Sequence, residues 1–150
     1  MLKRLMQTSD DVVPAILRLL LGVVIFPHGA QKMLGWFGGD GFSATMQGMS
    51  QMLPAAIVFL VIFIEFFGSI ALVAGFLTRV AAAGVLSVML GATLLIHKDV
   101  GFFMNWSGKQ SGEGFEYHLL AIAICLALMV AGGGRWSIDH SMSDKPLARR

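Results

Sequence analysis

Four long apolar stretches, each broken by only a few polar positions, dominate the pattern of this chain. They cover about residues 12–34, 54–75, 80–96 and 116–131. A helix needs roughly 20 predominantly apolar residues to cross a bilayer, and these stretches approach or exceed that length. The pattern therefore predicts four membrane-spanning helices.

A shorter amphipathic pattern lies between the first two stretches. The glycine-rich sequence WFGGDG (residues 36–41) favours a turn that ends the first helix. Beyond it, apolar residues recur with helical spacing at Phe42, Met46, Met49 and Leu53. This spacing predicts a short helix lying at the membrane surface. The predicted fold class is thus all-α, an integral membrane four-helix transmembrane bundle with an interfacial helix between the first two spans.

The composition agrees with a membrane protein and argues against other classes. Of the 150 residues, 56% are hydrophobic and only 13% are charged, whereas soluble domains carry about 25% charged residues. The net charge is +2, without a basic face or an aromatic platform, so no nucleic-acid partner is expected. We predict one membrane domain over residues 12–140, between short segments 1–11 and 141–150.

The distribution of basic residues predicts the orientation. Four spans place both termini on one side of the membrane, and basic residues concentrate on the cytoplasmic side of membrane proteins. The side that holds the termini would carry Lys3, Arg4, Arg79, Arg135, Lys145, Arg149 and Arg150. The opposite side would carry Lys32, Lys98 and Lys109. Segments 1–11 and 141–150 are therefore predicted to be cytoplasmic.

Two charged residues fall inside predicted spans. Glu65 lies near the middle of the second span, where a carboxylate costs about 2.5–3.5 kcal/mol on insertion scales. Arg18 lies about a turn and a half to the cytoplasmic side of the middle of the first span. We expect an Arg18–Glu65 pair inside the bundle. Two alternatives remain: the pair only fixes helix packing, or Arg18 extends to the surface and leaves Glu65 protonated.

A second polar group gathers at the opposite end of the spans. His28 and Lys32 share one helix face, His97 ends the third span, and Glu116 and His118 begin the fourth. Glu116 and His118 are two residues apart, so at most one should face the same cavity as His28. Such a cluster suits proton exchange with a bound carbonyl or quinone, because histidine titrates near neutral pH. The alternative for each histidine is a simple hydrogen-bonding role at the interface.

No metal site or intrinsic cofactor is predicted. Haem needs axial ligands that face each other at equal depth, and these histidines lack that arrangement. Cys125 is the sole cysteine, so dithiol exchange through a CxxC pair is excluded and a packing role is expected. Met46, Met49 and Met52 could bind copper(I), but they fit the apolar face of the surface helix better.

Three stretches of the chain resemble the DoxX family. They are RLLLGVVIFPHGAQKMLGWFGGDG from Arg18, IEFFGSIALVAGFLTRVAA from Ile64, and the segment from His97 that closes with GGGRWSIDH. The first matches the family's Arg, Gly, His-Gly and Lys pattern before a glycine-rich break. The resemblance covers about residues 12–140, with the motifs in the family's order.

The resemblance implies a four-helix protein of the bacterial inner membrane. Relatives include the small subunit of a thiosulfate:quinone oxidoreductase and members linked to membrane redox complexes. The leading hypothesis is therefore a quinone-interacting membrane subunit of an oxidoreductase complex, with electrons supplied by a membrane or soluble redox partner. With a single cysteine, a sulfur donor cannot be held by a cysteine pair. The alternatives are a non-enzymatic carrier of a small hydrophobic ligand, a scaffold or assembly protein for a partner complex, or a purely structural buried pair. Glycine-rich helix faces also permit a homodimer.

Overall fold

The computed structural model describes residues 5–143, and over that range the chain is helical with no β-strand, which confirms the all-α prediction. The long segments are α2 (Val12–Leu34), α4–η2–α5 (Ala55–Phe63, Ile64–Gly68, Ser69–Ala74), α6–η3 (Thr78–Ala92, Thr93–His97) and α7 (Glu116–Ala131). The short elements are η1 (Trp36–Gly38), α3 (Gly41–Met49) and α8 (Ile138–Met142). The elements η2 and η3 are single π-helical turns that continue α4 and α6.

The helices begin and end within two residues of the apolar stretches, because local signals coincide with the hydropathy pattern. The carboxylate of Asp11 accepts a hydrogen bond from the Val13 N–H at 3.0 Å and caps the first turn of α2. Gly35 ends the same helix in the left-handed region, with φ of 74°. The glycine-rich segment after it therefore breaks the helix, as predicted.

Three of the described helices are long and apolar enough to cross a membrane: Val12–Leu34, Ala55–Ala74 and Thr78–His97. The apolar helix α7 is shorter, with 16 residues. Large apolar side chains point outward, among them Leu20, Leu120 and Val130, which are 60%, 68% and 80% exposed. Lipid is the medium that covers such a surface at low cost. The chain is therefore a membrane protein.

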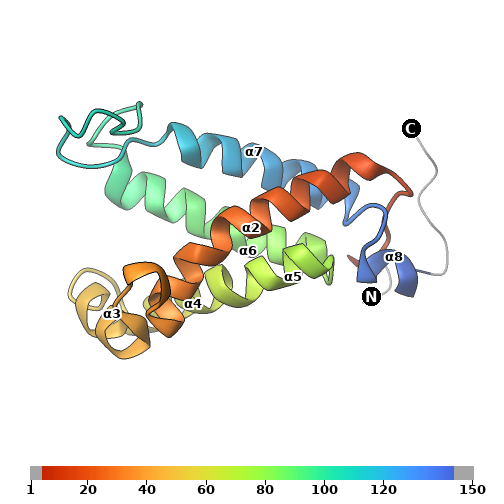
Figure 1. Cartoon of the computed structure of the whole chain (residues 1–150), viewed down its shortest axis with the longest axis horizontal. Coiled ribbons are helices and arrows are strands. Elements are labelled where there is room, and N and C mark those ends of the chain that lie inside the picture. The colour runs from red at the N-terminus through yellow and green to blue at the C-terminus, as the bar shows by residue number, and fades with distance from the viewer. Residues whose placement is uncertain (1–4, 144–150) are drawn as a thin grey trace.

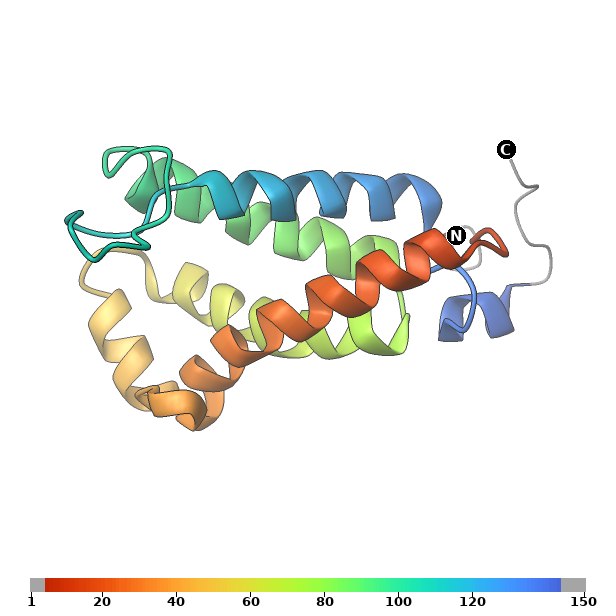
Figure 2. The ribbon, with the colours of Figure 1, turned by 45° about the horizontal axis from the view of Figure 1, so that its top comes forward.

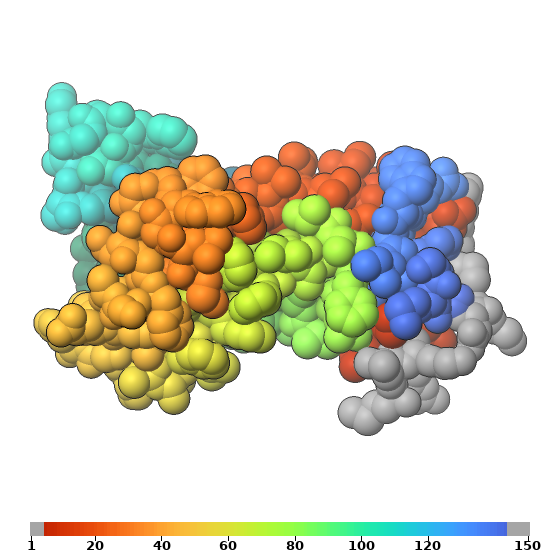
Figure 3. Space-filling view, turned by 60° about the horizontal axis from the view of Figure 1, so that its bottom comes forward, coloured from red at the N-terminus to blue at the C-terminus, as the bar shows by residue number. Residues whose placement is uncertain are grey.

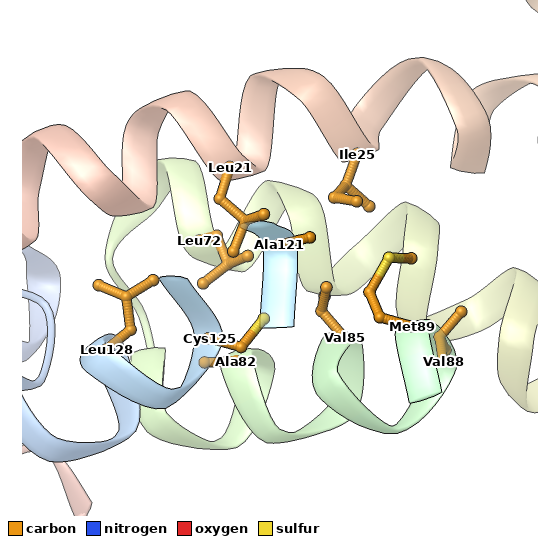
Figure 4. Close-up of a cluster of buried hydrophobic side chains, with 10 residues drawn as sticks. All are labelled: Leu21, Ile25, Leu72, Ala82, Val85, Val88, Met89, Ala121, Cys125 and Leu128. Carbon is orange, nitrogen blue, oxygen red and sulfur yellow. The ribbon is translucent and has the colours of Figure 1, made fainter. Parts of the chain in front are cut away.

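The four long segments pack around a continuous apolar core. In Figure 1, α7 runs beside α6 and α2 crosses over α5. Figure 4 shows buried side chains converging from all four segments, including Leu21, Leu72, Val85 and Leu128. The Cys125 thiol is fully buried in this core, so its side chain packs there as a small apolar group.

The two ends of the bundle differ. At the end that holds α8, called the α8 end, hydrogen bonds connect three segments: the start of α2, the α5–α6 turn and the chain after α7. The Arg135 N–H donates to the Asp11 carbonyl at 2.8 Å, and the Asp139 N–H donates to the Gly75 carbonyl at 2.9 Å. At the opposite end, called the loop end, lie α3 and the loop 98–115 (Figure 3). There α3 and α4 diverge from η3 and the loop (Figure 2).

Parts of the predicted cytoplasmic segments, residues 1–4 and 144–150, lie outside the described residues.

Candidate functional site

A cavity of about 530 Å³ occupies the loop end, where the helices diverge. Residues of α2, α4, η2, α6, η3, α7 and the loop 98–115 line it. Most of the wall is apolar, with Ile25, Val61, Ile64, Val88 and Met89 among the lining side chains. Cavities of this size, lined by apolar groups with a few polar ones, are typical of small-molecule sites.

The first polar group on the cavity wall is an ion pair between α2 and η2. The Lys32 ammonium donates to Oε2 of Glu65 at 2.5 Å, and the two side chains are 23% and 8% exposed. Lys32 Nζ also lies 3.4 Å from the His28 carbonyl, one turn earlier. His28 itself lines the cavity with its side chain exposed. We call Lys32, Glu65 and His28 the α2 cluster.

Two backbone features bring Glu65 next to α2. The π-helical turn η2 carries one residue more than an α-turn, and such turns recur at functional sites. Opposite it, Gly29 allows the backbones to approach closely: a Cβ at that position would lie 2.5 Å from the Phe66 nitrogen and 2.6 Å from the Glu65 carbonyl carbon. The absence of a side chain at Gly29 therefore sets the distance between α2 and η2.

The second polar group consists of His97 from η3 and Tyr117 and His118 from α7, and we call it the α7 cluster. The two imidazole rings lie 4.3 Å apart between centroids. The His97 Nδ1–H donates to the Glu113 carbonyl at 2.7 Å. His118 is only 7% exposed.

Two atoms of the α7 cluster are buried without a protein partner. Within residues 5–143, neither Nδ1 of His118 nor the hydroxyl of Tyr117 has a hydrogen-bond partner. Leaving such a group unpaired costs about 1–3 kcal/mol. Both residues line the cavity, so a ligand there can supply the missing hydrogen bonds. The α2 cluster and the α7 cluster therefore line the same cavity from different helices.

The predicted Arg18–Glu65 pair is wrong. Arg18 is 2% exposed and lies at the α8 end. Its guanidinium donates hydrogen bonds to the backbone carbonyls of Val73 (2.5 Å), Gly133 (2.8 Å) and Trp136 (2.9 Å). Longer hydrogen bonds reach the carbonyls of Leu72 and Arg135. These carbonyls lie near the end of α5 and in the segment after α7, and carbonyls at the C-terminal end of a helix suit a cation. Backbone acceptors satisfy Arg18, and Lys32 takes its place beside Glu65.

Glu116, a candidate site residue in the sequence analysis, does not line the cavity. Its Oε1 accepts hydrogen bonds from the Met104 N–H at 2.9 Å and from the Trp106 indole at 3.4 Å. Glu116 therefore fastens the loop 98–115 to the start of α7. Of the neighbours Glu116 and His118, only His118 faces the cavity.

Sequence reasoning missed Tyr117 and the two π-helical turns. Tyr117 could have been found as the polar aromatic residue next to His118, whereas hydropathy carries no signal for an extra residue in a helical turn. Of the three methionines in the surface-helix pattern, only Met49 lines the cavity. Within residues 5–143, no three His, Cys, Asp or Glu side chains gather as metal ligands would.

Comparison with known proteins identifies the family. The sequence model of the DoxX family matches residues 13–98. The chain is 29% identical to the Inner membrane protein YqjF of Escherichia coli (strain K12), over 93% of this chain and 99% of that protein. It is 26% identical to a Bacillus subtilis (strain 168) protein named "Putative oxidoreductase CatD", over 82% and 83% of the two chains. No solved structure matches the chain significantly. Because the family match covers more than half of the chain, the protein belongs to the DoxX family.

Proposed function

We propose that this protein is a quinone-interacting membrane subunit of an oxidoreductase complex. The observation that carries the proposal is the apolar cavity with two polar clusters on its wall, one of which holds two buried atoms without a partner in the described part of the chain. Flat apolar rings that carry polar groups at opposite edges fit such a cavity. A para-quinone is a ligand of this kind.

The groups on the two sides of the cavity match the chemistry of a quinone. Its two carbonyl oxygens accept hydrogen bonds, and Lys32, the Tyr117 hydroxyl and the His118 ring can donate them. Reduction to the quinol adds two electrons and two protons and turns both carbonyls into hydroxyls. His118 and His28 line the cavity, and their ring nitrogens can carry a proton to or from these oxygens. The electrons would come from a partner subunit or a soluble reductant.

The relatives agree with this assignment at a coarser level. One is named as an inner membrane protein and the other as a putative oxidoreductase. We infer that the present chain lies in a bacterial inner membrane, with α7 as a fourth crossing and α3 at the interface. The distribution of basic residues supports an orientation with the α8 end in the cytoplasm and the loop end outside.

The test is mass spectrometry of the molecules extracted from the purified protein. Wild-type protein should carry near-stoichiometric quinone, and Glu65→Gln and His118→Phe should lose most of it. The first removes the negative charge that holds Lys32 on the cavity wall, and the second removes the imidazole. Glu116→Gln is the matched control: it makes the same chemical change as Glu65→Gln, at the same end but outside the cavity. This variant should retain the quinone.

Other results would support a different function. A different enriched lipid or metabolite, lost in the same two variants, would indicate a carrier of a small hydrophobic ligand. Bulk phospholipid alone in every sample would contradict a quinone site and indicate a scaffold or assembly protein that acts through its partners.

A further inference from the structure

The cavity has an apolar side opening between α4 and the α6–η3 segment. Ile57 and Leu60 line one edge and Leu95 and Ile96 the other, and these four side chains are 45–62% exposed while also lining the cavity. In Figure 2, α4 separates from α6 toward the loop end. The inner wall of the cavity is therefore continuous with the outer surface at this edge.

Two glycines on one face of α6 show where the opening begins. Gly84 and Gly91 are seven residues apart, so they lie on the same side of the helix. A Cβ at Gly84 would lie 3.2 Å from the Ile64 side chain, so α6 and η2 are in contact there. A Cβ at Gly91 would meet nothing within 4 Å, although Gly91 lines the cavity. The two segments thus part between these positions, over about two helical turns.

The edges of the opening offer no charged group. The only hydroxyl-bearing residues of the α6–η3 segment beyond Thr78 are Ser87 and Thr93, and each donates to its own helix, to the carbonyls of Ala83 and Met89. On the other edge, α4 is apolar from Ala55 to Phe63. An opening of this kind between spanning helices faces hydrocarbon and admits apolar chains in preference to water-soluble molecules.

We infer that this opening, the side portal, holds the single apolar tail of a membrane amphiphile whose polar head lies between the α2 and α7 clusters. The inference rests on the proposed function and narrows its ligand class to quinones with a long alkyl or prenyl tail. Such a ligand enters laterally from the leaflet at the loop end. The apolar edges of the portal contact the tail, and the buried Tyr117 and His118 atoms bind the head.

The test compares two quinones with the same head, a tailless benzoquinone and its decyl derivative, binding to the protein in nanodiscs. The decyl compound should bind wild type at least about tenfold more tightly, since each buried methylene adds affinity. Gly91→Phe fills the open space and should remove most of this difference between the two quinones. Leu60→Trp narrows the portal from the opposite edge and should also remove most of the affinity difference between the two quinones.

Leu90→Phe is the matched control, because it adds a ring on the same turn of α6 at an exposed position that does not line the cavity. It should leave both affinities unchanged. If both quinones bind wild type equally, or if Gly91→Phe and Leu60→Trp preserve the advantage of the tail, the side portal is overturned while the quinone site stands. If neither quinone binds wild type, both the site and the portal fail.

Discussion

Single residues at the α8 end show how a membrane bundle accommodates buried charges. Arg18 donates to backbone carbonyls of α5 and of the segment after α7. Asp139, 1% exposed, accepts from the N–H groups of Leu77 (2.7 Å) and Thr78 (2.8 Å) at the start of α6. Leu77 has a φ of 46°, in the left-handed region that disfavours side chains, so these bonds hold a strained turn. Both charged groups therefore hold helix ends together through hydrogen bonds to the backbone.

This role predicts a strong effect of removing the guanidinium. Arg18→Leu leaves several buried carbonyls unpaired and should lower the free energy of unfolding by about 3 kcal/mol or more, because hydrogen bonds from charged groups contribute about 1.5–3 kcal/mol each. Thermal unfolding in detergent measures the loss. Lys109→Leu removes a positive charge from the exposed part of the loop and should be neutral. An unchanged midpoint for Arg18→Leu would refute the structural role.

The pairing of charged residues is also where sequence reasoning was weakest. Depth estimated along straight helices placed Arg18 and Glu65 within reach, but it ignored backbone carbonyls at helix ends as partners. Lys32 was correctly placed at the loop end beside His28, yet its side chain reaches to Glu65 along the cavity wall. Hydropathy identified the charged residues inside the apolar stretches, Arg18 and Glu65, but not the buried Asp139 beyond the last one. The partner that each charge takes depends on packing that the pattern of apolar residues does not reveal.

At the scale of elements, the boundaries were predictable and the irregular turns were not. The predicted stretch 80–96 is the helix Thr78–His97, because apolar length and turn residues coincide there. The π-helical turns η2 and η3, which present Glu65 and His97 to the cavity, leave no mark in the spacing of apolar residues. Gly29 could be read only as one small residue among many, although it determines the approach of α2 to η2.

The close contact at Gly29 predicts that even one methyl group is harmful there. Gly29→Ala places a Cβ against the backbone of η2 and should cost about 1–3 kcal/mol of stability by overpacking. Gly48→Ala is the control, since Gly48 lies in helix α3 with nothing within 4 Å of an added Cβ. It should be neutral or stabilising by up to about 1 kcal/mol, as alanine favours helices. Equal thermal midpoints for the two variants would contradict the close approach.

At the scale of the whole molecule, the ties at the α8 end bear on how often the chain crosses the membrane. The Asp11 carbonyl at the start of α2 accepts from the Arg135 N–H after α7, and the Thr8 hydroxyl accepts from the Gly134 N–H. The start of the first span and the segment after α7 therefore share one end of the bundle. Three crossings would leave them on opposite sides, whereas a fourth crossing by α7 brings them together.

Labelling of single cysteines tests this arrangement. In a Cys125→Ala background, Ser107→Cys lies on the loop 98–115 and Ser141→Cys on α8, both exposed. A membrane-impermeant maleimide should label Ser107→Cys in intact spheroplasts and Ser141→Cys only after permeabilisation, because four crossings with cytoplasmic termini put these sites on opposite sides. Labelling of both in intact spheroplasts would mean that α7 does not cross. The reverse pattern would keep four crossings but invert the protein, and the cavity would then open toward the cytoplasmic leaflet.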